Sequence, residues 1–254
     1  MVQQLSTPSV EEDLLYPDSD GEPVAENTKQ LDIMITLKGG LNALLEDAFV
    51  AADLFWYPVR LTAAQITAGE QPPKQAPDVM VAFGRPKGHR RSYKQWEEEN
   101  IAPQVVFEIV SNSNTLKELR EKKLAFYQKY GVEEYYMFDP ERQLLEGWLR
   151  VSNRLQPITA MKGWVSPRLN LRFHVEGELL QLYTDNGERL ASYAEMVEKS
   201  QQAVENARQE KERARQERER AQQEAERADR AEANLAAILA QLQAKGIDVD
   251  ELNR

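Results

Sequence analysis

The chain has 254 residues, a formal net charge of −10 and 41% hydrophobic residues, which suits one large domain or one domain with an appendage. It has no cysteine, so disulfides, thiolate metal sites and cysteine nucleophiles are excluded, and its two histidines, His89 and His174, are too few for a histidine metal cluster. The acidic balance argues against a surface that binds nucleic acid all over, although it leaves room for a local basic groove.

No signal peptide is visible at Met1–Ser9, and no run of about 18 apolar residues occurs anywhere in the sequence. We therefore expect a soluble, cytoplasmic protein without membrane contacts.

The first part of the chain predicts a polar segment followed by a helix and two strands. Residues 1–24 are polar and proline-rich, and apolar residues then recur at helical spacing up to about Asp47. Gly39-Gly40 within this helix predicts a kink or the close approach of another backbone. Strands are expected at Ala48–Tyr57 and at Pro77–Phe83, joined by a polar connection over residues 62–76.

Residues 103–139 predict a strand, a helix and a second strand. The apolar run Val105–Val110 lies between Pro103 and a polar turn, which is typical of a buried central strand. A helix is expected from about Thr115 to Tyr130, and Glu134–Asp139 returns as a strand. A unit of this length implies that its two strands pair in parallel.

Two charged residues in this unit require an explanation. Glu108 interrupts the buried apolar run, and a carboxylate there is costly unless another group pairs with it. Lys123 lies on the apolar stripe of the helix, so we expect it to point toward the sheet. The neighbouring Lys122 is about 100° away on the helix and is expected to face water.

Short strands are expected after this unit, and the composition changes from Glu188 onward. The strands are predicted at Leu144–Val151, Leu155–Thr159, Leu169–Phe173 and Glu178–Tyr183. Residues 188–246 then predict one long charged helix that ends at Gly246, followed by a tail over residues 247–254.

The long helix carries a weak heptad pattern. Its d positions are occupied by Ala207, Ala214, Ala221, Ala228, Leu235 and Leu242, whereas several a positions are charged. Two interpretations stay open: a homo-oligomeric coiled coil, or a solvated single helix held by i,i+4 ion pairs.

Asp78 and Glu108 are candidate metal ligands. Two carboxylates that converge at a sheet edge suit Mg²⁺, with Mn²⁺ as an alternative, and a nearby Lys123 would orient a water or offset charge on a phosphate. The structural alternatives are that Asp78 caps a loop and that Glu108 and Lys123 form a buried ion pair without a metal.

A basic patch lies in the charged loop over residues 84–102. It contains Arg85, Lys87, Arg90 and Arg91, together with His89 and Lys94. The pattern is equally typical of a phosphate-binding surface and of an ordinary solvated loop.

The sequence resembles the Uma-type branch of the PD-(D/E)XK nucleases over roughly residues 15–185. The resemblance is carried by PDVMVAF, VVFEIVSNSN and KLAFYQKYGVEEYYMFDP in this order and spacing, and by AKGIDVDEL after the long helix. It implies an α/β, restriction-endonuclease-like fold over residues 25–187, with a mixed sheet flanked by helices and the long C-terminal helix after it.

The resemblance also implies an activity and assigns residues to it. Asp78 matches the first aspartate of the motif, Glu108 matches the second acid, and Lys123 matches a catalytic lysine that has moved to the helix, because Val110 stands at the usual lysine position. Glu26 is a loose match to a fourth acid, and Lys29-Gln30 stands where the family pattern has His-Gln.

Three functions follow as hypotheses. The first is a Mg²⁺-dependent endonuclease that hydrolyses DNA, and the second is a non-catalytic scaffold that assembles or binds partners through its C-terminal helix. The third, reached by analogy of fold alone, is an enzyme that acts on another phosphate substrate.

Overall fold

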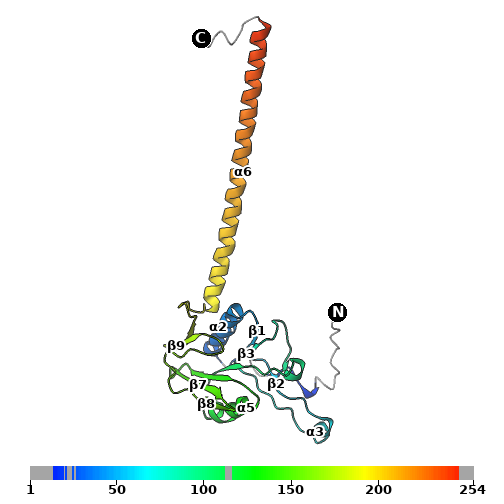
Figure 1. Ribbon diagram of the computed structural model, residues 1–254, viewed down its shortest axis with the longest axis vertical. Helices are drawn as coiled ribbons and strands as arrows, with labels where there is room; N and C mark the ends of the chain where they lie inside the picture. The colour runs from blue at the N-terminus through cyan, green and yellow to red at the C-terminus, as the bar shows by residue number, and fades with distance from the viewer. Residues whose placement is uncertain (1–13, 20, 22–24, 26, 112–115, 246–254) are drawn as a thin grey trace. The chain divides into compact units, whose positions relative to one another are not determined.

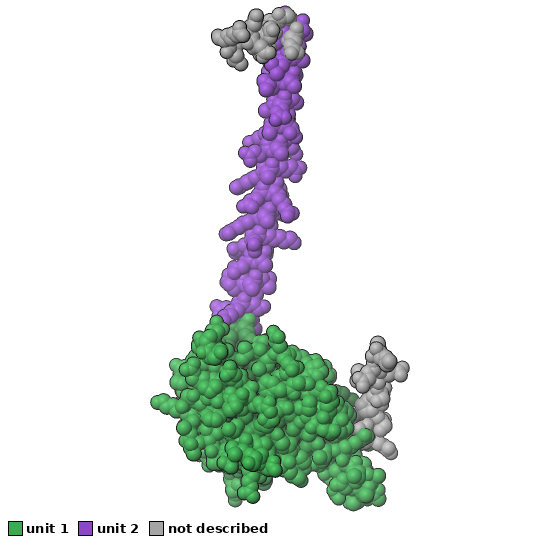
Figure 2. Space-filling view, viewed as in Figure 1, with its two compact units in different colours: residues 1–196 green, residues 197–254 purple. Residues whose placement is uncertain are grey.

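The computed structural model describes residues 14–19, 21, 25, 27–111 and 116–245, so the candidate acid Glu26 lies outside the described residues. The chain divides into two compact units, residues 1–196 and residues 197–254, which Figure 2 shows in different colours. The first unit carries every strand, and the second contains most of the C-terminal helix.

A six-stranded mixed sheet forms the centre of the first unit (Figure 1). Strands β5 and β6 pair in parallel, as predicted, and every other neighbouring pair in this sheet is antiparallel. The strands, in their order across the sheet, are β1 (Ala48–Ala51), β3 (Val79–Phe83), β5 (Val105–Ile109), β6 (Glu134–Asp139), β7 (Leu144–Val151) and β8 (Arg154–Pro157). The predicted α/β class with a mixed sheet is confirmed.

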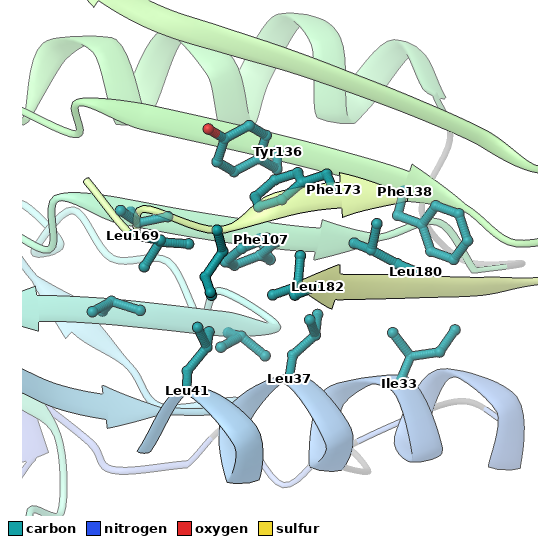
Figure 3. Packing of buried hydrophobic residues seen from close by; sticks show 14 of the residues in the cluster. Ile33, Leu37, Leu41, Phe107, Tyr136, Phe138, Leu169, Phe173, Leu180 and Leu182 are labelled. Atoms are coloured by element: carbon teal, nitrogen blue, oxygen red, sulfur yellow. The ribbon is translucent and has the colours of Figure 1, made fainter. Parts of the chain in front are cut away.

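Helix α2 (Thr28–Leu44) covers one face of the sheet. Asn27 caps it, because its side chain accepts a hydrogen bond from the backbone N–H of Gln30 at 2.8 Å. Figure 3 shows Ile33, Leu37 and Leu41 on one side of α2, directed toward a cluster that includes Phe107, Phe173 and Leu182. Burial of this apolar stripe fixes the helix against β1, β3 and β5.

The opposite face of the sheet packs against the helical stretch between β5 and β6. This stretch comprises α4 (Leu116–Glu118), a π-helical turn η2 (Leu119–Lys123) and α5 (Leu124–Lys129). Its buried residues Leu119 and Tyr127 join a cluster with Met80, Val106 and Tyr135. A continuous α-helix was the expectation, and the i→i+5 turn inside it is a feature that its residue pattern does not signal.

The predicted single strand Ala48–Tyr57 is wrong, because two strands in different sheets share it. Strand β1 ends at Ala51, and β2 (Trp56–Tyr57) pairs in parallel with β4 (Tyr93–Lys94). Between them Asp53 has a φ of +47°, in the left-handed region, which turns the chain out of the first strand.

The other elements of this unit are short. The polar connection contains α3 (Ala63–Thr67), which Thr62 caps through a reciprocal bond with Gln65, and the charged loop contains the 3₁₀ turn η1 (Gln95–Glu97). A separate hairpin pairs β9 (Arg172–Glu176) with β10 (Leu179–Tyr183), so the expected strand at Leu169–Phe173 begins later in the chain.

Gly39 and Gly40 serve close packing, because α2 continues through them without interruption. A Cβ added at Gly39 would lie 2.9 Å from Met196 Cε, and one added at Gly40 would lie 2.8 Å from Leu190 Cδ2. The glycine pair therefore lets the side chains that precede and open the last helix pack onto α2.

Helix α6 (Tyr193–Ala244) has 52 residues, so the predicted long C-terminal helix is confirmed. It is held along its length by i,i+4 contacts such as Arg215–Glu219. Leu235 and Ile238 are more than half exposed near its end. No helix in the described ranges is long and apolar enough to cross a membrane.

Candidate active site

The strand register brings Asp78 and Glu108 to the same face of the sheet. β3 and β5 are antiparallel, with Val79 opposite Phe107 and Met80 opposite Val106. One step further along this register, Asp78 lies opposite Glu108, and residues directly opposite in an antiparallel pair share a face. This is the face that packs against η2 and α5.

Glu108 is fully buried and receives two hydrogen bonds from the covering helix. Lys123 Nζ donates to Oε2 at 2.7 Å, and the hydroxyl of Tyr127 donates to Oε1. Lys123 and Tyr127 are four residues apart, so one helical face presents both donors. These contacts offset the cost of burying the carboxylate, which explains how Glu108 is accommodated inside an apolar strand.

Asp78 is also buried and receives hydrogen bonds from two elements. The backbone N–H of Ile109 donates to Oδ2 at 2.5 Å, and Nε2 of Gln30, at the start of α2, donates to Oδ1 at 3.3 Å. Asp78 thus connects β3 with β5 and with the helix on the other face of the sheet.

Burial and the neighbouring carboxylate change the ionisation of Asp78. Desolvation, followed by the charge of Glu108, raises the pKa of Asp78 to about 8, and Lys123 and the Ile109 N–H oppose this rise only in part. In the metal-free protein, Asp78 is therefore largely protonated at neutral pH. A divalent cation between the two carboxyl groups would favour the ionised form.

Lys123 and Tyr127 keep their protons. Burial acts to lower the pKa of Lys123, but the carboxylates of Glu108 and Asp78 outweigh it, and the net shift is upward. Burial, followed by the charge of Glu108, raises the pKa of Tyr127 well above its ordinary value. Both side chains are therefore hydrogen-bond donors at neutral pH, and Lys123 carries a positive charge.

The predicted residues Asp78, Glu108 and Lys123 are thus brought together, whereas Lys122 lies outside the cluster. The side chain of Lys122 is 78% exposed and lies 3.8 Å from Glu118. Sequence reasoning did not assign roles to Tyr127 or Gln30. Tyr127 lies one helical turn after Lys123, which was a usable signal, but the contact of Gln30 with Asp78 joins residues 48 positions apart.

Four residues of the predicted basic patch are each engaged within the protein. Arg85 pairs with Glu99, Arg90 with Glu98 and Arg91 with Asp18, and Lys87 Nζ donates to the Asn42 carbonyl. Arg90 also stacks over the ring of Phe49. A role of this patch in nucleic-acid binding stays a prediction.

The described part of the chain has no cluster of three or more histidine, aspartate or glutamate residues that could hold a metal ion. Among the described residues, Asp78 and Glu108 stay the predicted carboxylate ligands of an ion at this site. An ionised carboxylate has about four acceptor positions. Because each carboxyl group here accepts two hydrogen bonds, acceptor positions remain on both.

The fold and this cluster define a mixed α/β protein with two acids and a lysine on one sheet face. A sequence model of the Uma2 family, described as "Putative restriction endonuclease", matches residues 11–180, and the chain belongs to this family. This match confirms the resemblance seen in the sequence. It places the chain in a family of restriction-endonuclease-like nucleases.

Among solved structures, one match is the crystal structure of a "putative nuclease belonging to DUF820" from Anabaena variabilis. It has 15% sequence identity and a TM-score of 0.40, and the match covers 56% of this chain and 72% of that chain. No curated protein matches the chain.

Proposed function

We propose that the protein is a Mg²⁺-dependent endonuclease that hydrolyses phosphodiester bonds of DNA. Asp78 and Glu108 are the metal ligands in this proposal, and Lys123 is the catalytic lysine. The observation that carries it is the placement of both acids on one sheet face, with Lys123 Nζ 2.7 Å from Glu108. Membership of a restriction-endonuclease-like family supports the nuclease class.

The donor set fits a hard divalent cation. Mg²⁺ binds oxygen ligands, is commonly held by one or two carboxylates and retains several waters, and Mn²⁺ accepts the same ligands. The pKa of Asp78 is raised first by burial and then by the charge of Glu108, and a cation beside both carboxyl groups would offset the second effect. When bound, the metal would polarise a phosphate oxygen and lower the pKa of a bound water.

The protonated state of Lys123 favours one of its two expected roles. A lysine that keeps its proton is a poor general base, but its ammonium supplies a fixed positive charge beside the reacting phosphate. Such a charge stabilises the transition state as negative charge develops on the phosphate oxygens. Tyr127 and Gln30 act as positioning residues, because each holds one of the two acids.

Metal-dependent cleavage of supercoiled plasmid DNA tests the proposal. The wild type is expected to nick the plasmid with Mg²⁺ or Mn²⁺ and to be inactive in EDTA. The Asp78→Ala variant is expected to be inactive with either metal as well as in EDTA. Calorimetric titration with Mn²⁺ should show binding to the wild type and none to Asp78→Ala. The proposal would be refuted if the wild type binds no metal and cleaves none of several DNA and RNA forms.

A second candidate function is a scaffold that self-associates through α6. The observation in its favour is the exposed apolar pair Leu235 and Ile238 on a helix of about 80 Å. Residues of this kind are more often buried, and a second copy of the helix would cover them. This function is compatible with an active nuclease unit as well as with an inactive one.

A further inference from the structure

A polar cavity of about 750 Å³ opens at the carboxyl ends of the parallel strands β5 and β6. The first turn of α2, the start of α4 and the turn that follows β6 line it. Its size falls within the range of ligand-binding clefts, and the carboxyl ends of parallel strands are a common place for ligands in α/β proteins.

The cavity borders the candidate active site. Gln30 lines the cavity and donates a hydrogen bond to Asp78 at 3.3 Å. Val110 also lines it and directly follows Ile109, whose N–H donates to the other oxygen of Asp78. A polymer whose reacting phosphate lies at Asp78 would therefore extend its neighbouring groups into this cavity.

Three cationic residues line the cavity. The Arg142 side chain is 62% exposed, and its Nη1 lies 3.2 Å from Oδ2 of Asp139. Lys117 is exposed and forms no ion pair with any residue that the structure describes. Lys29 pairs with the exposed Glu178. The acids Asp139 and Glu141 also line the cavity, so the excess of positive charge is small and rests on Lys117 and Arg142.

The basic patch of the charged loop is less available for a ligand. Arg85, Arg90 and Arg91 are each paired with a carboxylate, and Lys87 donates to a backbone carbonyl. Phosphate binding by these side chains would require internal contacts to break. Lys117 has no such contact with any residue that the structure describes, and Arg142, whose side chain is 62% exposed, has one ion-pair partner, the buried Asp139.

We propose that this cavity binds the sugar–phosphate backbone of a nucleic acid next to the cleaved bond, with Lys117 and Arg142 as the phosphate contacts. The inference rests on the proposed nuclease function and adds the path of the substrate strand. It assigns substrate binding to the described residues that line this cavity, and it leaves the basic patch without a required role.

The test is nucleic-acid binding by the full-length chain in EDTA, which prevents metal-dependent turnover. Fluorescence anisotropy would compare labelled single-stranded and duplex DNA with the wild type and with the double variant Lys117→Glu, Arg142→Glu. The matched control is Lys122→Glu, which makes the same change of charge on the same helical stretch at a residue that does not line the cavity. Thermal unfolding checks that each variant is folded, and Lys117→Ala provides a milder substitution.

We expect the affinity of the double variant for DNA to be lower by about tenfold or more. The slope of its affinity against salt concentration should decrease by the equivalent of about two phosphate contacts. The control should stay within about twofold of the wild type. Wild-type affinity in the double variant overturns the inference, and if that variant also cleaves plasmid with Mg²⁺, the proposed function stands without it. A wild type that neither binds nor cleaves any nucleic acid overturns both.

Discussion

Lys123 Nζ lies 2.7 Å from Glu108 Oε2, and this ion pair joins the covering helix to the central strand of the sheet. Glu108 is completely buried, and the Lys123 side chain is only 13% exposed. The pair is therefore well shielded from water, and loss of one partner leaves the other as a buried, uncompensated charge. The same contact thus has consequences for stability and for the proposed catalysis.

Lys123→Ala is expected to abolish Mg²⁺-dependent plasmid nicking and to cost about 3 kcal/mol of stability, because Glu108 loses its charge partner. Plasmid cleavage and the thermal midpoint are measured on the same preparation, at a temperature where the variant is folded. Lys122→Ala is the matched control, and it should be nearly silent in both assays because Lys122 is exposed.

The opposite pattern would contradict the assignment. If Lys122→Ala loses cleavage while Lys123→Ala retains it, the catalytic lysine is the neighbouring residue. If the folded Lys123→Ala variant cleaves as well as the wild type, the ion pair is structural only.

Tyr127→Phe is expected to destabilise the protein by about 1–3 kcal/mol, because one buried oxygen of Glu108 loses its donor. Tyr135→Phe makes the same chemical change at a neighbouring buried tyrosine, whose hydroxyl has only a 3.3 Å contact with the Leu119 carbonyl, and it should cost less. Chemical denaturation of both variants measures the difference. Equal losses would show that the Tyr127 hydroxyl has no special role in holding Glu108.

Asp78→Asn is expected to stabilise the metal-free protein increasingly as the pH rises. The folded-state pKa of Asp78 is about 8 against 3.8 for the isolated group, so between these values the folded state holds a proton that the unfolded state has released. Wild-type stability therefore falls across this window and levels off above about pH 8. Asparagine does not ionise, so the variant avoids this loss.

Thermal unfolding in EDTA at several pH values between 5 and 9 measures this effect, with an expected relative gain of about 1–3 kcal/mol across the range. Asp47→Asn, at an exposed position, is the matched control. If the stability of wild type and of Asp78→Asn changes in parallel with pH, Asp78 is ionised throughout this range. The argument that burial and the charge of Glu108 raise its pKa would then fail.

The part of the fold that was predicted best is the unit with the most continuous apolar pattern. Val105–Ile109 and Glu134–Asp139 form the expected strands because a strand buried on both faces needs a nearly continuous apolar run, which Glu108 interrupts only once in the first of them. The break at Asp53 and the π-helical turn at Leu119–Lys123 were not predicted. Both depend on local backbone geometry that an ordinary residue adopts only under tertiary constraint.

The candidate site was likewise predicted only in part from the sequence. Glu108 and Lys123 attracted attention as charges on apolar surfaces, which sequence periodicity can detect. Their alignment with Asp78 depends on the register between β3 and β5, and no local signal fixes that register. Gln30 reaches Asp78 from a helix on the other face of the sheet, so only the folded chain reveals it as part of the site.

The last prediction concerns self-association through α6. A chain truncated after Met196 should fold, because this unit contains the core clusters on both faces of the sheet and keeps Leu190 and Met196 against Gly40 and Gly39. If α6 forms a coiled coil, the full-length chain should have a larger, concentration-dependent mass by light scattering, and the truncated chain should be monomeric.

A double substitution distinguishes the loss of self-association from the loss of mass that truncation itself causes. Leu235→Lys with Leu242→Lys places charges at two successive d positions, which removes the apolar contacts of a coiled coil and leaves the helix length unchanged. The matched control is Gln209→Lys with Gln223→Lys, at two f positions on the same helix that face away from the a and d seam. We expect the leucine variant to be monomeric and the control to keep the wild-type mass. A monomeric wild type across the concentrations tested would instead identify α6 as a solvated single helix held by its i,i+4 pairs.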